Sequence, residues 1–187
     1  MISSALSPYL RPTPRMRLIL TGLIVALLGL APPAVHSTQV LLAPGVTSER
    51  NLTASLAVGR DWDRRWFESS TGHLGGYWHT GYTWWENGKA GDSAHSISFS
   101  PVLVYFFHTE DWRPFIEFGV GAALFSRSRV GDRKLGSTVH FEDRFGAGVY
   151  LGDRSLLMFR LIHYSNAGLA SRNQGIESWS LVYGYRF

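Results

Sequence analysis

Three side chains near the C-terminal end of the sequence could form the catalytic centre of a hydrolase. Ser165 follows His163 by two positions in the stretch HYSNAG, and Glu177 comes 14 residues after His163. A serine hydroxyl becomes a nucleophile when an imidazole takes its proton, and a carboxylate orients that imidazole. These residue types predict hydrolysis through Ser165 without a cofactor. The alternative is a cluster of polar residues at a membrane interface with no catalytic role.

The segment that carries these residues alternates between two kinds of side chain. Phe159 and Leu161 occupy odd positions before His163 and Ser165, whereas Arg160 occupies an even position. Alternation with a period of two predicts a β-strand with two different faces. Alternate residues lie about 6.5–7 Å apart on one face, so His163 and Ser165 can meet. Glu177 can reach the same patch from the next strand if the loop between them closes back.

The rest of the chain repeats this pattern in eight segments separated by turn residues. They cover 39–46, 50–61, 73–86, 94–108, 112–126, 138–152, 155–165 and 176–187. An even number of antiparallel strands of about ten residues, ending in an aromatic residue such as Phe187, is typical of an outer-membrane barrel. We therefore predict an all-β fold, an eight-stranded antiparallel transmembrane β-barrel, over residues 38–187. A β-sandwich that happens to end in Phe is the alternative.

Charged and small polar residues of such a barrel face its lumen, and apolar residues face lipid. Glu117, Arg160, Arg186 and the polar positions of 140–144 are therefore expected to fill the lumen and leave no open pore. By the same alternation, His163, Ser165 and Glu177 are expected on the outer face near the extracellular rim.

Two features depart from regular barrel patterning. The connection 62–72 is long for a periplasmic turn, and we expect a short amphipathic helix or turn there, with Trp62, Trp66 and Phe67 at the membrane interface. Pro101 lies inside a predicted strand, where it cannot donate a ladder hydrogen bond, so we expect a β-bulge.

Residues 1–37 resemble a secretory signal peptide, with arginines before the apolar run 18–31 and small residues after it. The run is shorter than the roughly 20 residues that a spanning helix needs, although a transmembrane anchor is the alternative. We expect cleavage after Ser37, or after Ala34, and translation could begin at Met16.

Removing this segment takes Lys plus Arg from 18 to 15 against 14 acids, so the formal charge falls from +4 to about +1. That balance, without basic runs interleaved with aromatics, argues against nucleic-acid binding. The chain has no cysteine, so disulfides cannot hold it together. The remaining histidines lack the spacing of a metal site, and we predict none.

Several stretches resemble the PagL-type lipid A 3-O-deacylases of Gram-negative outer membranes. They are LIHYSNAG (161–168) followed by GIES (175–178), FEDRFGAG (141–148), RVGDRKLGSTVHFED (129–143) and STGHLGGYWHTGYTWWE (70–86). The resemblance covers nearly the whole chain after residue 37 and implies an outer-membrane barrel. It also implies an esterase that removes the 3-position acyl chain of lipid A in lipopolysaccharide.

The resemblance also implies roles for individual residues. Ser165 is the expected nucleophile, His163 the general base, and Glu177 the residue that orients the base. Asn166 matches the family's asparagine beside the nucleophile and is an expected oxyanion-hole contributor. Asn173 matches a second family asparagine, to which we assign no role.

Other residues are candidates for substrate binding. Phe159, Leu161 and Trp179 are expected to line an acyl-chain groove, and Arg127 and Arg129 to meet lipid A phosphates; ordinary lipid-facing and solvated loop positions are the alternatives. Other functions are a structural or adhesive barrel and a lipid A acyltransferase. The sequence leaves open whether the barrel forms a homodimer.

Overall fold

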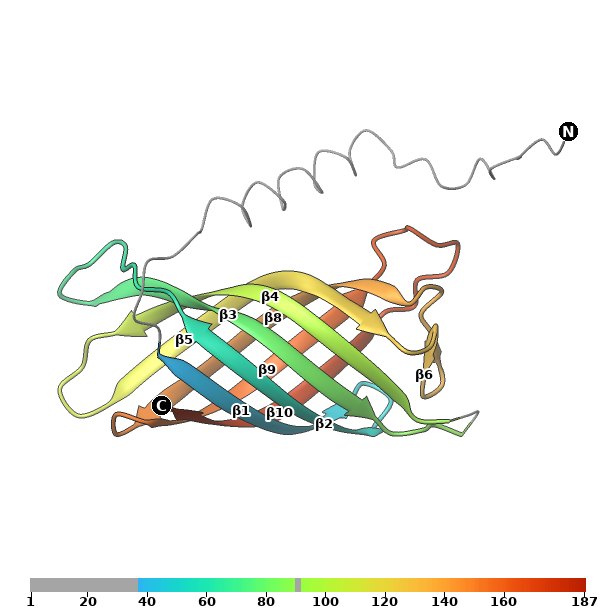
Figure 1. Cartoon of the computed structure of the whole chain (residues 1–187), viewed down its shortest axis with the longest axis horizontal. Helices are drawn as coiled ribbons and strands as arrows, with labels where there is room; N and C mark the ends of the chain where they lie inside the picture. Colours follow the sequence, from blue (N-terminus) through green and yellow to red (C-terminus); the bar gives the residue numbers. More distant parts are fainter. Residues whose placement is uncertain (1–36, 90–91) are drawn as a thin grey trace, which may run out of the picture. The chain divides into compact units, whose positions relative to one another are not determined.

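A computed structural model describes residues 37–89 and 92–187. It contains a closed barrel of eight long strands and a separate two-stranded hairpin (Figure 1). The predicted signal segment 1–36 lies outside the described residues. The barrel strands are β1 (Thr38–Thr47), β2 (Leu52–Asp61), β3 (Gly72–Trp85), β4 (Ala94–Phe107), β5 (Arg113–Phe125), β8 (Val139–Leu151), β9 (Ser155–Ser165) and β10 (Ile176–Arg186).

Consecutive barrel strands pair antiparallel, and the first strand pairs with the last. The order around the barrel is β1-β10-β9-β8-β5-β4-β3-β2. The closing pair runs from Gln39 opposite Arg186 to Thr47 opposite Ser178. Closure satisfies the backbone groups that an open sheet edge would expose to lipid. The predicted fold class is confirmed, and each strand lies within about two residues of its predicted segment.

Burial alternates along the strands as predicted. Arg160 on β9 and Ser180 on β10 are buried in the lumen, whereas Phe159 and Leu181 are exposed on the outer face. The described part of the chain contains no helix long and apolar enough to cross a membrane.

Two buried charge networks fill the lumen. In one, the guanidinium of Arg160 donates to Glu117 at 2.7 Å, and the hydroxyl of Tyr77 donates to the same carboxylate at 2.7 Å. In the other, Arg144 pairs with Glu142, which also accepts a hydrogen bond from Ser100 at 2.6 Å. Buried charges are tolerated when they are paired and hydrogen-bonded in this way.

These networks confirm Glu117, Arg160 and most of the polar residues in 140–144 as lumen residues. Asp143 is the exception, because it is exposed on the outer face.

The bulge predicted at Pro101 is absent. β4 keeps one register with β5 on both sides of the proline, from Phe99 opposite Ala122 to Val102 opposite Gly119. Between Ser96 and Phe106, β4 lacks a β5 partner only at Ser100 and Pro101, while Pro101 still faces Trp78 on β3. The missing N–H of Pro101 therefore leaves a local gap in the β4–β5 ladder, and β4 contains no extra residue there.

The helix considered for the connection 62–72 is also absent, and the segment is irregular and extended. Its backbone pairs with β3, because Trp66 N donates to Leu74 O and Leu74 N donates to Trp66 O, both at 2.8 Å. Trp62 packs edge-to-face on Trp66 and Trp78, with ring centroids 6.0 and 5.5 Å apart. Backbone pairing with a neighbouring strand outcompetes a helix of one or two turns.

The extracellular connection 126–138 contains structure that the alternation did not predict. A small hairpin forms from β6 (Arg129–Val130) and β7 (Arg133–Lys134). Val130 and Leu135 are buried in one apolar cluster with Trp85 and Tyr164, so the hairpin closes the extracellular end of the barrel.

Candidate active site

His163 and Glu177 form the centre of the candidate site. They are direct cross-strand partners in the β9–β10 register. His163 Nδ1 lies 2.9 Å from Glu177 Oε1, with 43% and 35% of the two side chains exposed. A carboxylate on Nδ1 holds the imidazole so that Nε2 is the nitrogen available to take a proton.

Ser165 shares the outer face of β9 with His163, two residues further along. The register of β8 and β9 sets Ser165 opposite Phe141 and His163 opposite Asp143. Ser165 is half-buried and is the last residue of its strand. The site therefore lies at the extracellular end of β9, on the surface that faces the bilayer.

Gly175 lies beside the imidazole and was not anticipated from the sequence. It has a positive φ of 61°, which favours glycine. A Cβ at this position would lie 3.0 Å from His163 Cε1 and 3.6 Å from Nε2. Any side chain at Gly175 would press against the edge of the imidazole that carries Cε1 and Nε2.

Asn166, directly after Ser165, is completely buried and ties two loops together. Its Nδ2 donates to Leu135 O at 2.9 Å and to Arg172 O at 2.7 Å, and its Oδ1 accepts from Gly168 N at 2.9 Å. Both amide hydrogens are therefore donated to loop carbonyls. In this geometry the side chain of Asn166 anchors the loops around Leu135 and Arg172.

Asn173 has a defined partner at the site. Its Oδ1 accepts the backbone N–H of Asn166 at 2.9 Å, and the residue is exposed. Because the amide oxygen of Asn173 points at the Asn166 N–H, the NH₂ group of the same amide points away from Asn166. The sequence marked Asn173 only by family likeness, because it lies seven positions after Asn166 in a loop.

The backbone between the two asparagines is unusual. Ala167 has a φ of 48° and Gly168 a φ of 80°, and Leu169 N donates to Asn166 O at 2.9 Å. A left-handed conformation costs alanine free energy, and residues held in this way often occur at functional sites.

Neighbouring loops support the site from two sides. Ser48 N donates to Glu177 O at 3.1 Å, which joins the β1–β2 turn to the carboxylate-bearing residue. Lys134 N donates to Gln174 Oε1 at 2.7 Å, and Arg133 pairs with Glu49 at 2.5 Å. The β1–β2 turn thus contacts the start of β10, the hairpin contacts the loop 166–175, and the turn and the hairpin contact each other.

The apolar substrate candidates are adjacent to the site. Trp179 is the cross-strand partner of Leu161, two residues from the His163–Glu177 pair. Phe159 follows on the same face of β9 and is 58% exposed. Together they form a continuous apolar surface below the polar pair, on the side away from the loops.

The basic candidates lie in the loop 126–138 and the hairpin. Arg127 pairs with Asp92 at 2.8 Å, so its charge is partly neutralised at the surface. Arg129 is the first residue of β6, and its backbone lies opposite that of Lys134 in the β6–β7 hairpin. Among residues 37–89 and 92–187, no group of three or more His, Cys, Asp or Glu side chains is placed to hold a metal ion.

Comparison with known proteins adds independent evidence. A family model described as Lipid A 3-O-deacylase (PagL) matches residues 51–186. A Pseudomonas aeruginosa protein named lipid A deacylase PagL is 46% identical over 167 residues, 89% of this chain and 96% of that protein. A Bordetella bronchiseptica protein of the same name is 33% identical over 104 residues, 56% of this chain and 57% of that protein.

The fold is also similar to a solved structure. The crystal structure of the outer membrane enzyme PagL has a TM-score of 0.76 and 50% identity, and the match covers 78% of this chain and 97% of that one. The family match spans well over half of the chain, and the barrel and the outward-facing site are consistent with it. The chain therefore belongs to the lipid A 3-O-deacylase (PagL) family and is an outer-membrane β-barrel.

Proposed function

We propose that this protein hydrolyses the ester bond that holds the 3-position acyl chain of lipid A, with Ser165, His163 and Glu177 as its catalytic residues. The observation that carries this proposal is the 2.9 Å contact between His163 Nδ1 and Glu177 Oε1, on the outer face that Ser165 shares. Family membership supports a hydrolase acting on lipid A.

The first half of the reaction transfers the acyl chain to the enzyme. His163 Nε2 takes the Ser165 proton as Oγ attacks the ester carbonyl, and Glu177 stabilises the imidazolium. When the tetrahedral intermediate collapses, the carbon–oxygen bond to the sugar breaks. The proton held by His163 passes to the sugar oxygen, which leaves as a hydroxyl.

The second half regenerates the enzyme. His163 takes a proton from water, the resulting hydroxide attacks the acyl-serine, and Ser165 leaves with that proton. The products are a 3-hydroxy fatty acid and a lipid A that lacks one acyl chain. This cycle needs no metal or cofactor.

Two donors are available for the oxyanion in this scheme. The Asn173 NH₂ group is oriented by the bond that its Oδ1 accepts from Asn166. Ala167 is the second residue after Ser165, and its backbone is held left-handed at a φ of 48°. We assign the oxyanion to the Asn173 amide and the Ala167 N–H, and assign Asn166 to holding both in place. A single such donor contributes about 10²–10³ in rate.

The position of the site explains how a lipid could reach it. The catalytic side chains face the bilayer near the rim, so the substrate can diffuse laterally without entering the lumen. In this scheme the acyl chain lies along Phe159, Leu161 and Trp179, and the lipid A phosphates lie near Arg127 and Arg129.

Mass spectrometry of lipid A tests the proposal directly. Cells that express the protein should lose one 3-hydroxyacyl chain from lipid A and release the free fatty acid. Cells that express Ser165→Ala should do neither. A chain transferred to another lipid would indicate an acyltransferase, and unchanged lipid A in both strains would indicate a structural barrel.

We also propose that residues 1–37 are removed during export. β1 begins at Thr38, so cleavage after Ser37 leaves every barrel strand intact. The intact mass of the protein purified from outer membranes tests this. A mature chain beginning at Thr38 is expected, and a retained apolar N-terminus would contradict it.

A further inference from the structure

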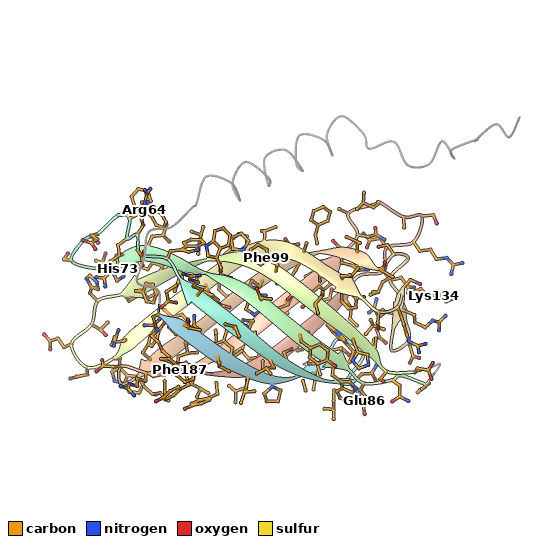
Figure 2. The ribbon with its side chains drawn as sticks, viewed as in Figure 1. Arg64, His73, Glu86, Phe99, Lys134 and Phe187 are labelled. Atoms are coloured by element: carbon orange, nitrogen blue, oxygen red, sulfur yellow. The ribbon has the colours of Figure 1, made fainter. Side chains whose placement is uncertain are left out.

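The end of the barrel opposite the candidate active site contains a separate cavity of about 430 Å³. We call it the periplasmic cup. Its lining includes His73, Phe106 and His108 and the charged residues Asp61, Arg64, Arg65, Arg113 and Arg186. Figure 2 shows Arg64 and His73 at one end of the barrel and Lys134 at the other.

The charge of the cup is strongly positive. Four arginines and one aspartate line it, so with neutral histidines its formal charge is +3. Asp61 pairs with Arg186 at 3.0 Å, and Arg113 pairs at 3.2 Å with Asp153, which is almost fully exposed. A concave wall on which one sign of charge predominates concentrates the field and attracts counter-ions.

Two of the arginines are held in place by one buried tyrosine. The guanidinium carbons of Arg113 and Arg186 lie 5.2 and 4.9 Å from the centre of the Tyr150 ring. Arg186 also donates to the Tyr150 hydroxyl at 2.7 Å. The π face of the ring stabilises guanidinium groups that would otherwise repel one another. The two cations are therefore oriented before any ligand arrives.

Arg64 and Arg65, which also line the cup, are exposed to solvent. Their guanidinium groups can therefore donate charge-assisted hydrogen bonds to an anion that enters from the periplasmic side. Arginine guanidinium groups match the geometry of phosphate oxygens particularly well.

The cup is closed toward the middle of the barrel and does not form a pore. Above it, Glu117, Arg160 and Tyr77 form the buried network that fills the lumen. A ligand entering from the periplasmic side would therefore bind and leave by the same side.

We propose that the periplasmic cup is a binding site for a phosphate group. The arginines contact the phosphate oxygens, and the rings of His73 and Phe106, stacked 5.0 Å apart, form the apolar wall beside them. The phosphate belongs either to a small soluble phosphate ester of the periplasm or to a phospholipid headgroup of the inner leaflet. The site is independent of the proposed deacylase reaction.

Two binding measurements on the full barrel in an uncharged maltoside detergent test this and distinguish the sources. The first follows the ³¹P line width of inorganic phosphate as protein is added. The second uses native mass spectrometry after exposure to equal amounts of phosphatidylglycerol and phosphatidylcholine. Arg113→Gln and Arg65→Gln should each weaken the phosphate complex about tenfold, the loss of one charge-assisted contact. Arg65 lies outside the strands, so its variant keeps the test valid if Arg113→Gln fails to fold.

Lys89→Gln is the matched control, because it removes one exposed charge at the opposite end of the barrel. A soluble phosphate is supported if Arg113→Gln and Arg65→Gln reduce the ³¹P line broadening and neither lipid is enriched in native mass spectrometry. Phosphatidylglycerol enrichment that the cup variants abolish supports a headgroup. The proposal is overturned if neither probe binds, or if Lys89→Gln weakens binding as much as Arg113→Gln. Lipid A deacylation should be unchanged in all three variants, so the two proposals fail separately.

Discussion

His163 and Glu177 face one another across the β9–β10 ladder, with Nδ1 and Oε1 2.9 Å apart. They lie 14 positions apart in the chain, but antiparallel pairing makes them direct neighbours. A ladder position is a rigid support, because both backbones are held by hydrogen bonds on either side. The imidazole is thus oriented by the sheet, while the residues around Ser165 are oriented by a loop.

Replacing Ser165 with alanine should reduce the rate of lipid A deacylation by at least about 10³-fold, because the nucleophile is lost. The rate is measured with purified barrel and lipid A in detergent micelles. Ser155→Ala is the control, since Ser155 begins the same strand at its other end and contacts Tyr183 at 3.1 Å. A Ser165→Ala protein with the activity of Ser155→Ala would contradict the proposed role.

Glu177→Gln should reduce kcat by about 10²–10⁴-fold and leave KM nearly unchanged. Glutamine keeps the size of the side chain but does not stabilise the imidazolium. Combining it with His163→Ala should cost little more than His163→Ala alone, because the two residues act as a unit. Fully additive losses in that double-mutant cycle would argue against a Glu177–His163 unit.

Asn173→Asp tests the proposed oxyanion role of Asn173 separately from its hydrogen bond to the Asn166 N–H. Aspartate keeps an oxygen that can accept the Asn166 N–H but has no amide hydrogens, so kcat should fall about 10²-fold or more while the loop remains ordered. Asn166→Ala should instead loosen the loop, since it removes the bonds to Leu135 and Arg172.

Hydrogen exchange of loop amides, measured beside kcat, distinguishes the two asparagine variants. Faster exchange in 166–175 is expected only for Asn166→Ala. If Asn173→Asp kept full activity, the oxyanion assignment would be wrong.

Gly175→Ala should lower kcat by displacing His163. Its Cβ would lie 3.0 Å from the imidazole Cε1, in a backbone with a φ of 61°. Gly168→Ala is a matched control for backbone strain, because Gly168 has a φ of 80° and nothing lies within 4 Å of its Cβ position. Kinetics of both variants should show the larger loss for Gly175→Ala, and equal losses would point to strain alone.

Glu117→Ala should destabilise the barrel by about 3–5 kcal/mol, because it leaves Arg160 buried without its carboxylate. Urea unfolding in lipid vesicles, followed by the gel mobility of the folded barrel, measures this. Replacing both residues together, as in Glu117→Leu with Arg160→Met, should recover most of the loss. A single variant as stable as the native protein would show that the ion pair contributes little.

Much of this architecture was predictable from the sequence, because alternate side chains of a barrel strand face the lumen and the lipid. Arg160 between apolar neighbours was enough to predict which face of β9 meets the lumen, and Glu117 between Ile116 and Phe118 did the same for β5. The connection 62–72 was not settled by its sequence, since its aromatic and charged residues suit either an interfacial helix or an extended segment. Backbone pairing of Trp66 with Leu74 decided between them.

The sequence by itself determined the number of barrel strands, the direction in which their side chains point, and the presence of serine, histidine and carboxylate on one face. These follow from local periodicity, which needs no knowledge of distant contacts. Only the tertiary structure decided that Glu177 lies opposite His163, that the Asn166 side chain anchors loops, that Gly175 must lack a side chain, and that arginines from three separate segments surround one cavity. Those facts depend on register and loop closure, which bring together atoms that the order of residues keeps apart.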